Sequence, residues 1–261
     1  VCGKGAMHME YDAEGFAYPV IDREKCVNCG LCRAACPMTK DLLYPKVERV
    51  TGGYVNDREV LEKSTSGGAF TALVKAWCTG SPYAVFGAAQ TEKLTTEHRY
   101  ITDLSDLDML RKSKYDQSRI GTAYADCKRL LSEGRKVVFT GTPCQIAGLR
   151  AFLGDKEYPE LLTIDVICEG VPSPKYKNSF IKEKHASSVK TLDYRDKDGG
   201  RWDYNVMSLT FENGKHITID RWVNPFFDIW MQHIMSRPSC YECRYTTSRR
   251  CSDITLGDLW G

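Results

Sequence analysis

The sequence lacks several features that would point to a membrane, to export or to nucleic acid. It contains no run of about 18 apolar residues, the length of a membrane-spanning helix, and no signal peptide opens it. We therefore expect no membrane span, and the cytoplasm is the expected compartment. The sequence also has no large excess of positive or negative residues, because the net charge is only +2. Without a basic stripe to neutralise phosphates, nucleic acid is not an expected partner.

Cysteine, in contrast, is abundant, with 12 among 261 residues. The chain is 42% hydrophobic and 27% charged, as in globular proteins, and is long enough for one large domain or a small domain with a larger one. Many of the cysteines fall in C-x2-C pairs. This usage in a chain of enzyme size indicates metal or redox chemistry in a reducing compartment.

The strongest motif is Cys26-Val-Asn-Cys29-Gly-Leu-Cys32-Arg-Ala-Ala-Cys36-Pro37. Its C-x2-C-x2-C-x3-C-P spacing is the pattern with which bacterial ferredoxins hold a 4Fe-4S cluster. Three thiolates two residues apart can surround one corner of a cluster, and we expect the fourth cysteine to begin a helix and turn away. In two-cluster ferredoxins that fourth cysteine binds the other cluster. Cys2 is therefore the candidate that completes the first set.

Zinc and disulfides are the alternatives for this motif. Zinc sites usually combine two separated C-x2-C pairs, or a cysteine pair with a histidine pair, and four closely packed cysteines match them poorly. Adjacent thiols on one tight loop rarely reach disulfide geometry. We therefore favour the cluster.

The first residues, Val1-Cys2-Gly3-Lys4-Gly5-Ala6, are similar to the end of a first ferredoxin motif. We expect the sequence to begin inside a two-cluster ferredoxin module. In that case Cys36 would await three ligands outside this sequence. Gly3 departs from the proline that usually follows such a cysteine.

Beyond Pro37, residues 38–57 are polar and carry glycine and proline without any periodicity, which predicts a connector at a domain boundary. A helix is predicted from the Gly67-Gly68 turn to Gly80, and Lys112 to Ser118 should form a polar loop. The other predicted elements are strands at 83–88, 136–140 and 161–167, helices at 105–112, 119–133 and 143–153, a hairpin of 206–212 and 215–220 about Asn213-Gly214, and a helix at 225–235. Ser105 and Thr142 are the expected caps, with Pro143 in the first helical position. This alternation predicts an α/β core with a mixed or parallel sheet.

A second cysteine pair, Cys240-Tyr-Glu-Cys243, could be half of a zinc ribbon, but no further C-x2-C follows it. The available partners are Cys144, at a predicted helix N-terminus, and Cys168, after a predicted strand. Both positions lie where α/β proteins build sites. Cys144 could instead be a nucleophile, because a helix N-terminus lowers a thiol pKa. No histidine stands near it in sequence to act as a base, so we favour a ligand.

Four segments together carry a family resemblance: Thr140-Gly-Thr-Pro-Cys144-Gln145, Asp165-Val-Ile-Cys168-Glu-Gly-Val-Pro-Ser-Pro174, Cys240-Tyr-Glu-Cys243 and Ser252-Asp-Ile-Thr-Leu-Gly-Asp-Leu-Trp-Gly261. They resemble the coenzyme F-420 hydrogenase/dehydrogenase beta subunit family, over nearly the whole chain. The resemblance implies an FAD-dependent oxidoreductase whose flavin lies beside a 4Fe-4S cluster. It implies Cys144, Cys168, Cys240 and Cys243 as the cluster ligands. The flavin contacts that it implies are Ser66, Gly67, Gly68, Phe70, Thr71, Lys112, Ser113, Lys114, Tyr115, Gly141, Thr142, Pro143 and Gln145.

The expected fold class is α+β or α/β. Residues 1–50 would form a partial ferredoxin-like iron-sulfur domain holding Cys2, Cys26, Cys29, Cys32 and Cys36. Residues 58–261 would form a larger mixed-sheet FAD and 4Fe-4S domain, truncated at its C-terminus.

Elementary chemistry supports part of this assignment. A Ser/Gly turn that enters a helix at Gly67-Gly68 offers free backbone N–H groups and a positive dipole end to the FAD pyrophosphate, although such a turn alone is more typical of simple packing. Lys112 and Lys114 could pair with phosphate or with a reduced flavin, or simply be solvated. Arg249 and Arg250 are interpreted as a solvated patch rather than a docking edge for an acidic partner.

The remaining cysteines have no motif. Cys78 and Cys127 lie on apolar helix faces and should be core residues, whereas Cys251 has no assigned role. The five histidines are isolated, so core or surface roles are expected for them.

These observations predict a cytoplasmic flavin and iron-sulfur oxidoreductase. Flavin would exchange hydride with one substrate, and the clusters would pass single electrons to or from a redox partner protein or subunit. The resemblance makes coenzyme F-420, a deazaflavin, the first candidate substrate, with other hydride donors or acceptors as alternatives. An electron-transfer subunit without a substrate site, and a zinc-stapled module without turnover, are the competing hypotheses. No catalytic side chain is predicted.

Overall fold

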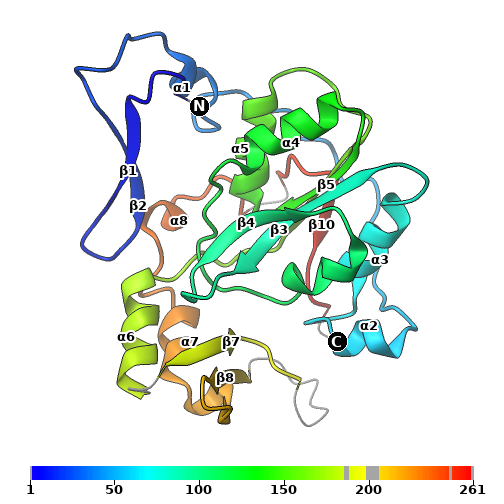
Figure 1. Ribbon diagram of the computed structural model, residues 1–261, viewed down its shortest axis with the longest axis vertical. Helices are drawn as coiled ribbons and strands as arrows, with labels where there is room; N and C mark the ends of the chain where they lie inside the picture. Colours follow the sequence, from blue (N-terminus) through cyan, green and yellow to red (C-terminus); the bar gives the residue numbers. More distant parts are fainter. Residues whose placement is uncertain (1, 185–187, 198–205, 247–248, 260–261) are drawn as a thin grey trace.

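A five-stranded mixed sheet forms the centre of the molecule (Figure 1). The computed structural model describes residues 2–184, 188–197, 206–246 and 249–259. The strand order is β10-β6-β5-β3-β4, with the first four strands parallel and β4 antiparallel to β3. The strands are β3 (Tyr83–Gln90), β4 (Thr96–Ile101), β5 (Lys136–Gly141), β6 (Leu161–Val166) and β10 (Ile254–Leu256). The predicted α/β core with a mixed sheet is confirmed.

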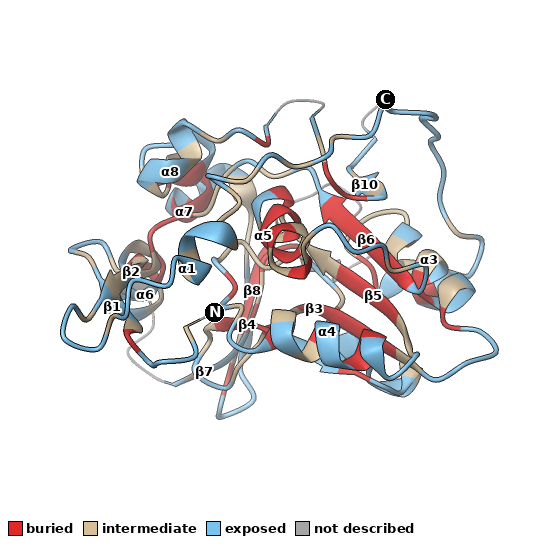
Figure 2. Ribbon diagram, turned by 90° about the horizontal axis from the view of Figure 1, so that it is seen from above, coloured by how far each residue is buried: buried red, intermediate tan, exposed pale blue. Residues whose placement is uncertain are grey.

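Helices cover both faces of this sheet because its inner strands are apolar on both sides. Val137 and Phe139 of β5 pack against α4 (Ala123–Ser132) and α5 (Pro143–Leu153), whereas Val138 between them packs on the opposite face with α3 (Ala69–Trp77). Figure 2 shows β3, β5, β6 and α5 as the largely buried interior. Side chains that alternate across a fully covered strand produce two separate cores.

A second lobe contains a three-stranded antiparallel sheet in the order β7-β8-β9. Its elements are α6 (Pro174–Lys184), β7 (Val189–Asp193), β8 (Met207–Phe211), β9 (His216–Ile219), the 3-10 turn η3 (Arg221–Val223) and α7 (Pro225–Met231). The predicted hairpin is confirmed, because β8 and β9 join at Asn213-Gly214 and Gly214 has φ +81°. Aromatic residues of α6 and α7 form the core of this lobe together with Tyr194 and apolar residues of β7 and β8.

The N-terminal region holds an antiparallel hairpin of β1 (Met7–Tyr11) and β2 (Ala17–Ile21), followed by the short helix α1 (Leu31–Ala34). The hairpin stands beside α8 (Pro238–Tyr241) in Figure 1. Residues 41–55 contain neither helix nor strand and lead into α2 (Arg58–Glu62), which agrees with the predicted connector. The division of the chain into two domains stays a prediction.

Several predicted boundaries were wrong for identifiable reasons. The helix predicted from Arg119 begins only at Ala123, because Arg119 pairs with β4: its N–H donates to Thr96 O at 2.9 Å, and its carbonyl accepts from His98 N at 2.8 Å. The predicted helix at 105–112 is a 3-10 helix, η1 (Leu104–Met109), and Asp103 rather than Ser105 caps it. The helix at 225–235 ends at Met231, since His233 takes a left-handed φ of 58°.

No helix within residues 2–184, 188–197, 206–246 and 249–259 has the length and apolar character needed to cross a membrane.

The Gly67-Gly68 turn packs against the connector, which makes Gly68→Ala a sensitive substitution. Gly68 has φ +80°, and a Cβ added there would lie 2.7 Å from Val55 Cγ2. We expect Gly80→Ala, at φ +71° in open space, to cost about 1–2 kcal/mol of unfolding free energy from backbone strain alone. Gly68→Ala should cost about 1–3 kcal/mol more through overpacking. Urea unfolding of both variants measures the difference, and equal losses would contradict the packing role of this turn.

Candidate functional site

In the first cysteine motif, Cys26 and Cys29 lie on the loop between β2 and α1, and Cys32 is the second residue of α1. Asn28 and Gly30 take left-handed φ values of 53° and 73°, which turn the backbone sharply between Cys26 and Cys32. Cys29 is exposed, and the other two cysteines are partly buried. The loop therefore presents three thiols at the protein surface within one tight turn.

The hairpin brings Cys2 to the same end as this loop. Met7 pairs with Ile21, the carbonyl of Ala6 accepts from Asp22 N at 2.8 Å, and Cys26 N donates to Asp22 O at 3.0 Å. Cys2 and Cys26 thus extend from the two strands at one end. Backbone N–H groups of Lys4 and Ala6 lower the pKa of the Cys2 thiol, and Ala6 N lies 3.3 Å from Sγ. Hydrogen bonds of this kind favour a thiolate, the form that binds iron.

The expectation that Cys36 begins a helix was wrong. Helix α1 ends at Ala34, and Cys36 lies in the turn after it, donating its N–H to Arg33 O at 3.1 Å. Pro37 cannot donate a hydrogen bond, and the chain turns again as Thr39 N binds the Cys36 carbonyl at 3.1 Å.

The second cysteine set comes from three elements. Cys144 is the second residue of α5, directly after β5, while Cys168 follows β6 and Cys240 lies in α8 with Cys243 just beyond it. Thr142 and Pro143 begin α5 as predicted, with Gln145 Oε1 accepting from Thr142 N at 3.0 Å. The carboxyl ends of two adjacent parallel strands therefore deliver Cys144 and Cys168 to one edge of the sheet.

These four thiols lie close enough to influence one another. Burial, with smaller contributions from the nearby Cys144, Cys240 and Cys243, raises the pKa of Cys168 to about 11. Cys144 keeps access to solvent, yet the protein atoms around its thiol raise its pKa, with added contributions from Cys243 and Cys240. The Cys168 loop also packs on α8, since a Cβ added at Gly170 would lie 3.4 Å from Cys240 Cβ.

The donor chemistry of both sets fits a 4Fe-4S cluster. Among the residues that the structure describes, no group of three or more cysteine, histidine or acidic side chains stands in the arrangement that would hold a metal ion. A 4Fe-4S cluster takes one thiolate per iron, so its ligands surround a volume instead of converging on a single ion. All-thiolate sets also match the preference of iron-sulfur clusters over oxygen-loving metals.

The three segments implied as flavin contacts lie next to one another. Thr65 Oγ1 accepts from Ser113 N at 3.0 Å, and Arg111 Nε donates to Thr71 Oγ1 at 3.1 Å, which joins the α3 turn to the loop at 112–118. Gln145 Nε2 in turn donates to Ser118 O at 3.2 Å. The segments that hold Ser66 to Thr71, Lys112 to Tyr115 and Gly141 to Gln145 are therefore contiguous.

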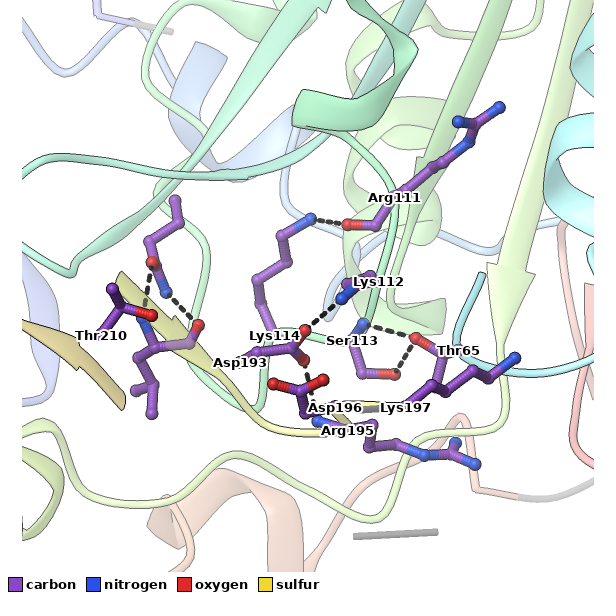
Figure 3. A network of polar contacts seen from close by, with 12 residues as sticks. Thr65, Arg111, Lys112, Ser113, Lys114, Asp193, Arg195, Asp196, Lys197 and Thr210 are labelled. Carbon is purple, nitrogen blue, oxygen red and sulfur yellow. Dashed lines mark hydrogen bonds and ion pairs between the residues drawn. The ribbon is translucent and has the colours of Figure 1, made fainter. Parts of the chain in front are cut away.

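Polar partners hold the lysines of the loop in place, as Figure 3 shows. Lys112 pairs with Asp193 of β7, and the Lys114 ammonium donates to the Arg111 carbonyl. Lys197 Nζ reaches Leu61 O at 2.8 Å, beside the α3 turn. The expectation of a solvated lysine was wrong for the partly buried Lys114, whereas Lys112 is exposed and pairs with Asp193 at the surface.

His98 is a buried residue of this region whose contacts no spacing rule could reveal. Its Nε2 lies 2.9 Å from Thr140 O, and its Nδ1 contacts Ser118 Oγ. Burial lowers the His98 pKa to about 4, so the ring is neutral at physiological pH. This confirms a core role for His98, while His185 lies outside the described residues.

Arg250 does not belong to a solvated patch. Its side chain is 14% exposed, and Nη1 lies 3.6 Å from Oδ2 of Asp165, which is fully buried. Arg249 stacks over Tyr44, with the guanidinium carbon 5.0 Å from the ring centre.

The predicted core positions of Cys78 and Cys127 are confirmed, and Cys251 is buried in the same core as Cys127.

Two family models match the chain. Residues 134–261 match the model for the C-terminal part of the coenzyme F420 hydrogenase/dehydrogenase beta subunit. This segment belongs to that family. Residues 17–38 match a 4Fe-4S binding domain, so the chain carries an iron-sulfur module as the Cys26 to Cys36 spacing predicts. The beta-subunit segment contains Cys144, Cys168, Cys240 and Cys243, and its last two residues lie outside the described ones.

The fold of the chain also resembles a solved structure. A chain of the F420-reducing NiFe hydrogenase complex from Methanosarcina barkeri is 22% identical in sequence, with a TM-score of 0.52 over 80% of this chain and 72% of that one. At this level of identity the likeness shows the fold. No curated protein matches the chain.

The buried amine of Lys114 predicts a pH dependence of stability. Burial lowers the Lys114 pKa from 10.5 to about 8, with Asp193 opposing the shift and Lys112 adding to it. Between about pH 8 and 10.5 the unfolded chain holds this proton more often than the folded protein, so the Lys114 contribution to the unfolding free energy rises with pH. We expect the difference in urea midpoint between wild type and Lys114→Met to change across this window. The exposed Lys75→Met should show no such change, and identical profiles for both variants would contradict the burial of Lys114.

Proposed function

We propose that this chain is a flavin- and iron-sulfur-dependent oxidoreductase subunit that couples hydride exchange with a deazaflavin, coenzyme F420, to single-electron transfer. One observation carries the proposal: the turn from Gly141 to Gln145 belongs both to the second cysteine set and to the segments implied as flavin contacts. It holds Cys144 of the second cysteine set and is also one of the three contiguous flavin segments. A cluster and a flavin bound to these residues would be neighbours across a single turn.

Cys2, Cys26, Cys29 and Cys32 would hold one 4Fe-4S cluster, and Cys144, Cys168, Cys240 and Cys243 a second. Cys36 stays a predicted ligand toward a further cluster. When bound, FAD supplies a centre that accepts two electrons as hydride and returns them singly, which an iron-sulfur cluster can accept. A partner subunit or redox protein would exchange the single electrons.

The chain's own residues would prepare this site in three ways. The N-terminal N–H groups of α3, a nine-residue helix, suit the diphosphate of the flavin. Asp193 and the Arg111 carbonyl position Lys112 and Lys114 beside it. The capping bond from Thr142 N to Gln145 Oε1, together with the neutral His98 beneath the turn, fixes the backbone that presents Cys144.

Anaerobic purification with iron, sulfide and flavin quantitation, followed by titration with reduced F420, tests the proposal. Two clusters and one FAD per chain are expected, with the flavin absorbance bleached by reduced F420 and restored by the oxidised coenzyme. Clusters and FAD without a response would discard this substrate and favour another hydride partner or an electron-transfer subunit. Zinc in place of iron would overturn the proposal.

A further inference from the structure

Arg237, the residue before α8, contacts strand β2 of the N-terminal hairpin. It directly precedes α8, and its own carbonyl accepts from Cys240 N at 2.8 Å. Its N–H donates to Val171 O at 2.9 Å, three residues beyond Cys168. The backbone of Arg237 is therefore anchored to two of the three segments that carry the second cysteine set, the loop after Cys168 and α8.

The side chain of Arg237 reaches in the opposite direction. One terminal nitrogen donates to Ala17 O of β2 at 3.0 Å, and the other donates to Gln117 Oε1 at 2.9 Å. The guanidinium carbon lies 4.3 Å from the centre of the Tyr18 ring and 5.5 Å from that of Phe16. A planar fork that binds two acceptors while stacking on aromatic rings is a geometry that lysine cannot reproduce.

The rest of the hairpin has a second contact with the main body. At its tip, Ser173 Oγ donates to Glu14 O at 2.8 Å, and Phe16 is fully buried. These contacts fix the tip, whereas Arg237 holds the strand that leads on to Cys26. In Figure 1 the hairpin lies next to the segment that leads into α8.

We propose that Arg237 is a positioning residue that sets the separation and orientation of the two cysteine sets. This inference rests on the proposed function, because it concerns redox groups held by both sets. The separation governs how readily one electron leaves a reduced group on one set and reduces an oxidised group on the other. Neither family model nor the cysteine spacing assigns such a role to this arginine.

Two measurements on the anaerobically purified protein test the role. Electron paramagnetic resonance of the fully reduced protein reports the magnetic interaction between two paramagnetic clusters, which weakens with the cube of their separation. Amide hydrogen exchange of residues 7–21, compared with that of β5, reports hairpin docking without reference to any cofactor. The variants are Arg237→Ala and Arg237→Lys, with Arg58→Ala, an exposed arginine paired with Glu62, as the control.

In both Arg237 variants we expect unchanged iron and sulfide content and a weaker magnetic interaction. Amide exchange in the hairpin should be faster by about tenfold or more, which corresponds to a decrease of about 1.4 kcal/mol in the free energy of local opening. Arg58→Ala should match wild type in every readout. An unchanged interaction and unchanged exchange in Arg237→Ala would overturn the inference, as would two intact wild-type clusters that do not interact. Wild-type protein without iron would instead refute the proposed function, and the inference would fall with it.

Discussion

Replacing Lys177 with methionine is expected to lower the unfolding free energy by about 3–5 kcal/mol, the cost of stranding a buried charge. Lys177 of α6 is 4% exposed and its partner Asp116 is 7% exposed. Lys177 Nζ also donates to Leu94 O at 2.8 Å, and Asp116 accepts from Thr96 Oγ1 at 3.2 Å. Removing the ammonium leaves a largely buried carboxylate without its main partner.

The double variant Lys177→Met/Asp116→Leu should recover most of the loss, because replacing a buried pair by apolar side chains is often nearly neutral. Arg58→Ala, which removes one partner of an exposed ion pair, is the matched control and should cost about 0–1 kcal/mol. Urea unfolding of the four proteins gives the comparison. A loss of less than about 1 kcal/mol in Lys177→Met, the range of an exposed pair, would show that the pair is hydrated.

The position of this pair matters for the site. Asp116 lies in the loop that carries Lys112 and Lys114, while α6 belongs to the second lobe together with β7 and its Asp193. The pair therefore fixes the loop against α6, in the same lobe as the strand that supplies the partner of Lys112. We expect flavin retention in Lys177→Met to fall together with stability, which gel filtration of the purified variant followed by flavin quantitation would show.

Local sequence determined those parts of the fold whose signals are contiguous. Thr142 and Pro143 identified the start of α5, and Asn213-Gly214 identified the hairpin of β8 and β9. In each case the residue types satisfy backbone requirements within about four positions. The same locality explains why the Cys26 to Cys36 spacing was sufficient to predict an iron-sulfur module.

Features that depend on contacts between distant segments were missed. The hairpin of β1 and β2 was missed although Met7 to Tyr11 alternate apolar and polar residues, because the alternation is short and Pro19 interrupts the pattern in β2. The helical periodicity begins at Ile120, but Arg119 pairs with Glu97 of β4, because tertiary pairing outweighs helix propensity there. Asp193, Arg237 and Lys197 join the site through partners that are 81, 220 and 131 residues away, and no spacing rule reports such pairs.

Replacing Cys144 with serine is expected to remove about half of the bound iron and sulfide, because one of two four-thiolate sets would lose a ligand. Serine preserves the approximate volume of the side chain and its contact with Thr142 Oγ1, which lies 3.1 Å from the Cys144 sulfur. The capping bond from Thr142 N to Gln145 remains, so the turn should keep its shape and the flavin should be retained. Loss of iron without loss of flavin would therefore locate the defect at the thiolate itself.

Cys78→Ala is the matched control, because Cys78 is buried at the C-terminal end of α3. Burial raises the pKa of its thiol to about 11, which disfavours a thiolate. It should retain full iron and sulfide. Cys29→Ser should remove the complementary half, and the double variant Cys29→Ser/Cys144→Ser should hold almost none. Full iron in Cys144→Ser would exclude Cys144 as a ligand.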